Sequence, residues 1–504
     1  MEASPPSFID PLEEVLRKTQ DMDPGVHAVS TGNLIRVVDT PHAWGRPMTS
    51  AGVAALAEQA VRDLAATVET IIASATSHVD VVSLGTPTGV FWTAVRNGLR
   101  KLAERAAGAP VTVRFLFGYV PVYDQVEAFK AELCAFCSEA RLPMKTMTVL
   151  VGRLAPRYGF TWNHAKIVAA DGRMALVGGH NLWDSAYGTY PPVHDISVQV
   201  FGDAAAHARL FADFLWKNGG TILSVWKVSE TCTMTPLPFD SGREKVTLDR
   251  PPPATGDKAI KAPTGGGFVE GRVLTLGRGG ALGSSASDIA KERIIKSAQR
   301  TLKFCQQDLL FEGRAGDDRH QVCVWIAEAL LANPGLQVSI VVSPVDGSGG
   351  GEPYSWGSGA AGTFDMLKRL ITKKAKDADE IRAVLTRLQV APFCFTALPP
   401  FTEGRDYVWP EVPKERLSLR MSVRAPIPSP IGWRTPAPGN HAKVFIADDV
   451  ACYVGSDNLY PHNLMEFGYL IEGPAARAIV ENYWNQVWRY SGPHALGGPP
   501  KAKL

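Results

Sequence analysis

The sequence contains one pattern of six residues twice, and this repeat limits the fold more than any other feature. In each copy, histidine, lysine and aspartate are followed by glycine, a small residue and asparagine at identical spacings. The first copy runs from His164 to Asn181, and the second runs from His441 to Asn458. Two copies of so specific a pattern indicate an internal duplication. We therefore predict two similar halves instead of a single core.

The residues around the repeat predict the class of fold. Segments with helical and strand periodicity alternate along the chain, which is typical of an α/β protein with a mixed sheet. Each copy reads as a hairpin, since Asp171 followed by Gly172 is a strong signal for a two-residue turn. We expect Asp171 and the matching Asp448 to brace the site from these turns. We predict two α/β sandwich halves that pack around a pseudo-twofold axis like a dimer within one chain, so that a monomer suffices.

Composition marks the expected boundaries between the halves. Proline and glycine concentrate in residues 235–267, which predicts a linker with little regular structure. The first half is then residues 1–234, and the second half is residues 268–504. Residues 347–362 are rich in glycine and serine, which predicts a mobile loop. Residues 397–438 form a long segment punctuated by proline, which we expect to be functional or disordered.

Charge and hydropathy exclude some classes of protein. The net charge of the 504 residues is +2, so the chain shows no sign of a surface that coats a polyanion such as nucleic acid. No window approaches the roughly 18 uncharged apolar residues of a membrane-spanning helix. The first residues lack a basic region followed by an apolar run. From this we expect either an intracellular protein or a leader that has been removed.

The doubled pattern, His-x-Lys-x4-Asp-x6-Gly-(Gly/Ser)-x-Asn, resembles that of the phospholipase D superfamily. The flanking sequence is most similar to the secreted actinobacterial phospholipases D, in stretches that include Trp162–His164, Gln306–Leu309, Gly455–Tyr460 and Trp488–Ser491. The resemblance covers most of residues 30–491 and implies secretion, although no signal peptide is visible. The chain departs from those enzymes in two further respects: Glu466 stands where they usually carry aspartate, and the segment before the second copy is longer.

The side chains of the repeat suit an attack on a phosphodiester, whose negative oxygens repel nucleophiles. Lys166 and Lys443 would bring positive charge to the phosphoryl oxygens, and Asn181 and Asn458 would supply amide donors. Because four such donors are present, we expect no requirement for a metal ion or another cofactor. The sequence shows no convincing cluster of metal ligands.

The two histidines supply the remaining chemistry. A neutral imidazole is a competent nucleophile near pH 7, and a protonated imidazole is a good acid. The resemblance assigns the nucleophile to His164, which would form a phosphohistidine while His441 protonates the departing alcohol. His441 would then activate water or an acceptor alcohol. We expect Asp195 and Glu466, the acids that follow the two copies, each to bind the far nitrogen of its own histidine.

By the same resemblance, aromatic side chains would line a pocket for the head group of the substrate. Trp162 stands beside the first copy, Trp183 and Tyr187 follow it, and Tyr354 lies in the glycine-rich segment. Their faces suit a quaternary ammonium group through cation–π attraction. Ordinary packing is the alternative explanation for these four aromatic residues.

The combined prediction is a phospholipase D that hydrolyses phosphatidylcholine-like phospholipids at a membrane or micelle surface. The products would be phosphatidic acid and a free alcohol, with transphosphatidylation when another alcohol replaces water. Two alternatives stay open: a phosphodiesterase or nuclease of the same superfamily, and a non-catalytic phospholipid-binding relative. The balanced charge argues against nucleic acid as a partner, and the intact pairs of histidines and lysines argue against binding alone.

Overall fold

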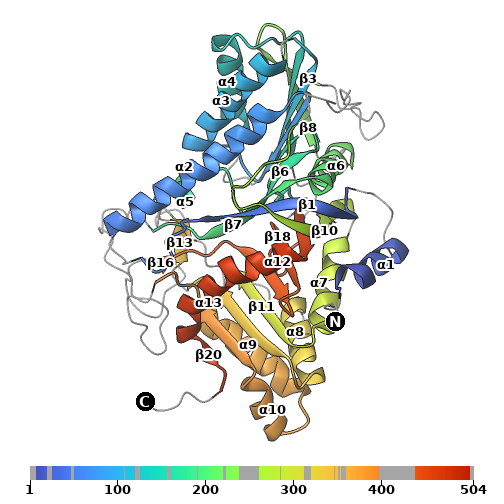
Figure 1. Ribbon diagram of the computed structural model, residues 1–504, viewed down its shortest axis with the longest axis vertical. Coiled ribbons are helices and arrows are strands. Elements are labelled where there is room, and N and C mark those ends of the chain that lie inside the picture. Colours follow the sequence, from blue (N-terminus) through green and yellow to red (C-terminus); the bar gives the residue numbers. More distant parts are fainter. Residues whose placement is uncertain are drawn as a thin grey trace.

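The computed structural model confirms the predicted α/β class, with helices on both sides of a large mixed sheet (Figure 1). None of the described helices has an apolar stretch long enough to cross a membrane. The structure describes residues 7–19, 25–46, 50–106, 108–119, 125–155, 161–189, 191–218, 223–237, 260–283, 285–311, 319–344, 347–349, 352–353, 359–396 and 437–499.

A single sheet of 17 strands runs through the molecule. In the first half, β2, β3 and β4 are parallel neighbours, whereas the other strands pair antiparallel. The order from the outer edge inward is β9 (Met234–Pro236), β8 (Leu223–Val228), β4 (Met147–Leu154), β3 (Val111–Gly118), β2 (His78–Ser83), β5 (Ile167–Ala170), β6 (Met174–Gly178), β7 (Asp195–Phe201) and β1 (His27–Thr40).

The second half repeats this arrangement. Counted outward from its innermost strand, it has four antiparallel pairs, two parallel pairs and one antiparallel pair, as the first half has from β1 to β8. The order is β10 (Val269–Gly279), β19 (Met465–Glu472), β18 (Ala451–Gly455), β17 (Lys443–Ala447), β11 (Thr301–Gln306), β12 (Gln337–Val342), β15 (Leu388–Pro392) and β20 (Leu496–Gly497).

Strands β1 and β10 form the seam between the two halves. They pair antiparallel, from His27 opposite Leu276 to Ile35 opposite Val269. An antiparallel pair relates its two strands by a local twofold rotation. Because the strand order repeats outward on each side of this pair, the molecule is a pseudo-twofold dimer within one chain.

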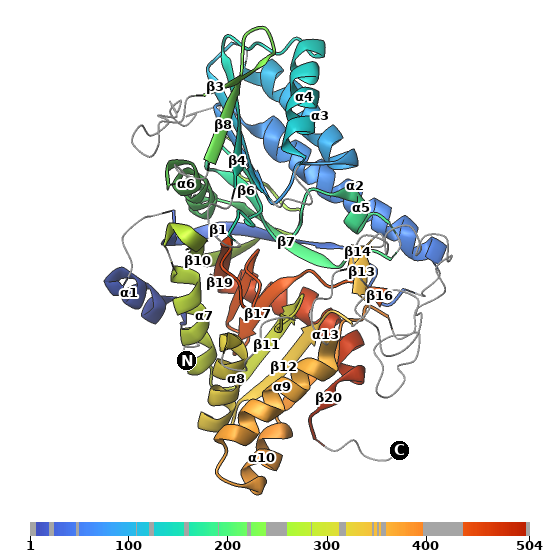
Figure 2. The same ribbon diagram turned by 180° about the vertical axis from the view of Figure 1, so that it is seen from behind.

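Helices cover both faces of the first half-sheet (Figures 1 and 2). Helices α2 (Ser50–Ser74), α3 (Gly89–Ala106) and α4 (Val126–Glu139) enclose one core, and α6 (Asp203–Asn218) contributes to the core on the other face. Residues of β5 alternate between the two, since Val168 faces the first core and Ile167 faces the second. Both α6 and α12 (Pro474–Ile479) contact β1 and β10, so the second core continues across the seam.

The other described helices complete the two halves. They are α1 (Ile9–Thr19), α5 (Asp184–Tyr187), α7 (Ala286–Ser297), α8 (Gln321–Ala332), α9 (Gly359–Lys374), α10 (Ala378–Leu385) and α13 (Asn485–Ser491), with the π-helical turn η4 (Val480–Trp484) and the short 3-10 turns η2 (Gly280–Leu282) and η5 (Gly492–His494).

Each copy of the repeated pattern forms a hairpin within the sheet, β5–β6 in the first half and β17–β18 in the second. The turn residues Asp171 and Gly172 have φ angles of 52° and 63°, and Asp448 and Asp449 have 53° and 60°. Two consecutive left-handed residues match the twist of the flanking strands. The pairing of Ala170 with Met174 and of Ala447 with Ala451 nevertheless leaves three residues in each loop instead of the predicted two. The aspartate and glycine signals thus predicted the hairpin positions correctly, but not the loop length.

Some local predictions are corrected by the structure. His164 and Lys166 precede β5 and do not lie within a strand. The glycine-rich segment contains the short strands β13 (Gly347–Gly349) and β14 (Glu352–Pro353), because β13 pairs with β14 and with β16 (Ala437–Pro438).

The predicted linker and the long segment before the second copy fall mainly outside the described residues. Within the linker, residues 238–259 are not described, and its first residues belong to β9. The segment 397–436 is likewise not described. The predicted boundaries of the halves therefore stay a prediction.

Candidate active site

The two histidines of the repeat face each other at the seam. His164 lies just before β5 and His441 just before β17, and their ring centroids are 6.4 Å apart. Both residues are buried, with 5% and 4% of their surface exposed. The pseudo-twofold arrangement therefore brings one histidine from each half to a single place.

Two isolated β-bridges explain how the halves interlock at this place. The residue before each histidine bridges the residue before the acid of the opposite half: Asn163 pairs with Met465, and Asn440 pairs with His194. Backbone hydrogen bonds support both bridges on matching atoms. Each acid is therefore delivered to the histidine of the other copy.

The contacts of the two acids correct the sequence prediction. Nδ1 of His164 lies 2.9 and 3.0 Å from the carboxylate oxygens of Glu466, and Nδ1 of His441 lies 2.7 Å from Asp195. The expectation that each acid binds its own histidine is wrong. The bridges are the cause, because they place each acid beside the histidine of the opposite half and away from the histidine of its own half.

Each carboxylate is held by a hydroxyl group as well as by its histidine. The hydroxyl of Tyr187 donates to Asp195 (3.0 Å), and that of Ser456 donates to Glu466 (2.5 Å). Gly179 is the counterpart of Ser456 in the first copy, and a Cβ atom there would lie 2.0 Å from an oxygen of Asp195. The repeat therefore has glycine at 179, where Tyr187 binds the acid, and serine at 456, where the serine hydroxyl itself binds the acid.

These contacts fix the reactive nitrogen of each imidazole. A carboxylate accepts a hydrogen bond from Nδ1, so Nδ1 carries the proton and Nε2 has the lone pair in the neutral ring. Burial, together with the nearby Lys166 and Lys443, holds the pKa of both His164 and His441 well below the usual value. Burial also raises the pKa of Glu466 to about 7. Both imidazoles are therefore neutral in the free protein.

The two lysines of the repeat lie beside the histidines. Lys166 Nζ donates to the backbone oxygen of His164 (2.6 Å), and Lys443 Nζ donates to that of His441. Both are buried, and burial lowers the pKa of Lys166 to about 7 and that of Lys443 to about 8. Burial disfavours the charged form of both lysines, so an anion bound beside them would stabilise their positive charge.

An oxyanion that binds at this site should draw protons onto the lysines. In the free protein Lys166 is partly neutral between pH 7 and 8, because its pKa is about 7. A bound dianion favours the charged form and raises this pKa, so sulfate binding should take up protons near pH 7.5 and take up few below about pH 6. Titration calorimetry of sulfate in two buffers of different ionisation enthalpy measures this uptake. Lys166→Met should reduce it and the exposed-site control Lys217→Met should not; uptake that is unchanged in Lys166→Met would contradict the assignment.

The amide side chains predicted to bind phosphate lie in the same buried region. Asn181 and Asn458 are each 1% exposed, and the Oδ1 atom of each has no hydrogen-bond partner among the described residues. The Asn458 amide nitrogen donates to the Tyr460 hydroxyl (2.9 Å), and the Tyr187 hydroxyl accepts from the backbone N–H of Asn181 (2.9 Å). An amide oxygen only accepts hydrogen bonds, so these unpaired atoms suit a donor group and not a phosphoryl oxygen. The predicted role of the two amides as donors to phosphate therefore stays a prediction.

The turn aspartates make their hydrogen bonds to the backbone at the start of a neighbouring strand. Asp171 accepts from the backbone N–H groups of residues 76, 77 and 78 and from two hydroxyls, those of Thr76 and Ser77. Asp448 accepts from the backbone of residues 299, 300 and 301. Both carboxylates thereby tie a hairpin to β2 or β11, which is the kind of contact that bracing requires.

The four aromatic residues predicted to line a head-group pocket have different surroundings in the structure. Tyr187 is completely buried and occupied with Asp195, which removes it from a pocket wall. Trp183 is half-buried against the first core, and its indole N–H donates to the Thr86 backbone (3.2 Å). Trp162 is half-buried, and its carbonyl accepts from Met465 (3.0 Å). Tyr354 lies outside the described residues.

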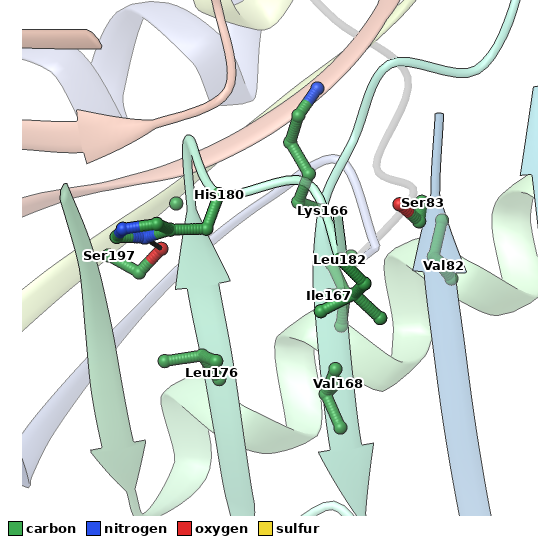
Figure 3. A pocket seen from close by; sticks show the side chains of 10 residues that line it. Val82, Ser83, Lys166, Ile167, Val168, Leu176, His180, Leu182 and Ser197 are labelled. Carbon is green, nitrogen blue, oxygen red and sulfur yellow. Dashed lines mark hydrogen bonds between the residues drawn. The ribbon is translucent and has the colours of Figure 1, made fainter. Parts of the chain in front are cut away.

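A small hollow lies in the first half beneath Lys166 (Figure 3). The Lys166 side chain extends beyond the end of β5, and His180 lies beside Ser197. His180 is held by the hydroxyls of Ser197 (2.8 Å) and Thr40 (3.0 Å). The lining residues are Val82, Ser83, Lys166, Ile167, Val168, Leu176, Gly178, His180, Leu182 and Ser197. The hollow has room for about one water molecule, so it is too small to add a second binding site.

One group of described side chains has the composition of a metal site. Asp457, His462 and Glu466 bring their polar atoms within 4.8 Å of one another. Two cations already lie against this group, since Lys291 Nζ is 2.9 Å and Arg278 Nη1 is 3.7 Å from Asp457. These cations balance the carboxylate charge, so the group does not call for a metal ion.

The sequence did not reveal two of the contacts that shape the site, those of Ser456 and His462 with Glu466. Ser456 was part of the repeat, but its hydrogen bond to Glu466 depends on the fold. His462 lies four positions before Glu466 and outside the repeat. A histidine close to a repeated acidic position was the only available signal.

Comparison with known proteins agrees with this geometry. No model of a known protein family matches the chain. The chain is 26% identical to a phospholipase D of Streptomyces antibioticus over 545 aligned positions, which cover 97% of this chain and 88% of that protein. Its fold is similar to the crystal structure of a phosphatidylserine synthase from Haemophilus influenzae, with a TM-score of 0.54 and 13% identity, covering 97% of this chain and 92% of that one. The resemblance predicted from the doubled pattern is confirmed.

Proposed function

We propose that this chain, a relative of the phospholipase D superfamily, is a phospholipase D that hydrolyses phosphatidylcholine-like phospholipids to phosphatidic acid and a free alcohol. The observation that carries the proposal is the pair of crossed carboxylate–histidine contacts, flanked by two buried lysines. A nucleophile, an acid and positive charge thus meet at one place, and a phosphodiester requires all three.

The first chemical step uses the neutral imidazole of His164. Nε2 attacks phosphorus, the bond between phosphorus and the alcohol oxygen breaks, and His441 gives its proton to that oxygen. Glu466 stabilises the positive charge on His164, and Lys166 and Lys443 stabilise the charge on the phosphoryl oxygens. In the free protein, burial lowers the pKa of His441. The negative charge of the bound substrate phosphate favours the protonated form of His441, which can then act as the acid.

The second step reverses these roles. His441 takes a proton from water, the water oxygen attacks phosphorus, and the bond from phosphorus to His164 breaks. An acceptor alcohol in place of water would give transphosphatidylation. Asp195 supports the imidazolium of His441 in both steps, as the acid of a catalytic triad does. Each half contributes one histidine and the acid for the other half, so a monomer at a membrane or micelle surface suffices.

Two substrates test this proposal directly. The protein is incubated with phosphatidylcholine vesicles and, separately, with single-stranded DNA. We expect choline release that is lost in His441→Asn and retained in His207→Ala, a histidine on α6 that contacts Thr275. DNA cleavage without choline release would favour the nuclease alternative, and binding of vesicles without either reaction would favour a non-catalytic relative.

A further inference from the structure

The Glu466 carboxylate is completely buried and lies within 4 Å of polar atoms of His164, Ser456 and His462. His164 and Ser456 make the hydrogen bonds given above. The third neighbour is His462, whose Nδ1 lies 3.9 Å from Oε1 of Glu466. Glutamate has one more rotatable bond than the aspartate at position 195, so its carboxylate needs more support to hold one orientation.

His462 is itself held in place from two directions. Its Nε2 atom lies 3.2 Å from a carboxylate oxygen of Asp457 and 3.0 Å from the backbone oxygen of Asn458. The ring of Tyr460 packs on it edge to face, with centroids 5.4 Å apart. Only 7% of the His462 side chain is exposed. Nδ1 accepts a hydrogen bond from the backbone N–H of Leu464 (3.2 Å), so the imidazole has one orientation and meets Glu466 by packing and charge, without a hydrogen bond.

A buried charged network fixes these supports. Lys291 and the Ser287 hydroxyl contact Asp457 at 2.9 and 2.5 Å, both from α7. Arg278, on β10, places Nη1 3.3 and 3.4 Å from the ring nitrogens of His462 and donates to its backbone oxygen (2.7 Å). The imidazole is thus tied to two elements outside its own loop.

The described residues of the first half support their acid differently. The counterpart of Asp457 in the repeat is His180, which hydrogen-bonds Ser197 and Thr40 and interacts with Asp195 by charge. The hydroxyl of Tyr187 supports Asp195 in its place. The charged network around His462 therefore surrounds Glu466, the acid that binds His164, and not Asp195.

We propose that His462 is a positioning residue for the reaction, because it keeps the Glu466 carboxylate aligned on Nδ1 of His164. The expected kinetic effects of His462 rest on the proposed function, whereas its contact with Glu466 does not. His462 also lowers the pKa of Glu466, whereas burial raises it. The other charged groups around Glu466 lie on several elements: Lys166, Lys443, Asp457, Arg278 and His164 itself.

Removal of His462 tests this role. In His462→Ala we expect kcat for choline release to fall about 10-fold or more, because a misaligned partner costs part of the acid–base contribution. KM should stay within about twofold of wild type, since His462 contacts the backbone oxygen of Asn458 and not its side-chain amide. The low-pH limb of the kcat profile should move to higher pH, because Glu466 loses a neighbour that lowers its pKa. His462→Gln, whose amide can still donate to the Asn458 carbonyl, should restore most of kcat.

A second measurement does not depend on the substrate. His462 itself lowers the pKa of His164, so loss of the ring alone should move the NMR titration of His164 to higher pH in both His462→Ala and His462→Gln. A less well aligned carboxylate stabilises the imidazolium less, so the titration should lie at lower pH in His462→Ala than in His462→Gln. The control His207→Ala should leave both the titration and the kinetics unchanged. If wild type releases no choline, the proposed function fails, and the titration still decides the role of His462. A His462→Ala protein with the same His164 titration and pH profile as His462→Gln would overturn the proposal, even if it were less stable or less active.

Discussion

Replacing His441 with asparagine is expected to give a protein that reacts once and then stops. With phosphatidyl-p-nitrophenol the leaving group is a weak base, so it departs without a proton from His441. His164 should therefore still attack and release one equivalent of p-nitrophenol. Hydrolysis of the phosphohistidine needs His441 to activate water, so steady-state turnover should fall by about 10²–10⁴-fold or more.

Stopped-flow absorbance and the stoichiometry of the first burst measure this outcome. The matched variant His164→Asn should show no burst, and acid-labile, base-stable label on the protein should appear only when His164 is present. Each histidine has a carboxylate at Nδ1 and a buried lysine beside it, so the burst experiment decides between the two. A burst in His164→Asn together with none in His441→Asn would move the nucleophile to the second half.

Local signals predicted the parts of the fold that depend on local interactions. The repeat spacing indicated two halves, and the strand order now shows them on each side of β1 and β10. Asp171 marked its hairpin because two consecutive left-handed residues favour aspartate, asparagine and glycine. These features are set by a few neighbouring residues, so a single sequence contains enough information for them.

The pairing of acid and histidine could not be predicted in this way. Asp195 and Glu466 each follow a histidine of their own copy, and sequence proximity favoured pairing within a copy. The bridges between Asn163 and Met465 and between Asn440 and His194 reverse that pairing. They form only because the seam brings the two half-sheets together, and this is a long-range contact.

The role of Tyr187 shows a second limit of the same kind. An aromatic residue after the repeat suits a binding pocket and a core equally well by composition. The structure buries Tyr187 and directs its hydroxyl to Asp195. A hydroxyl group can support an acid only when the fold brings the two together, so its partner was not visible in the sequence.

The crossed pairing predicts which reaction step each acid controls. Asp195→Asn should leave the burst of p-nitrophenol nearly intact and slow turnover by about 10³–10⁴-fold, because an asparagine at Nδ1 of His441 favours the wrong tautomer. Glu466→Gln should instead slow the burst itself, because Glu466 is the partner of the nucleophile His164. Asp195 thus acts in the step of the second-half histidine although it belongs to the first half.

Pairing within each half would give the opposite result, with a slow burst in Asp195→Asn and a normal burst in Glu466→Gln. Adding Asp195→Asn to His441→Asn should cost little more than His441→Asn alone, because residues that act as a unit are not additive. The same addition to Glu466→Gln should combine two separate losses, one in each step. Because both acids are buried and lie at matching places in the fold, a general loss of stability would affect the two variants alike and would not separate the steps.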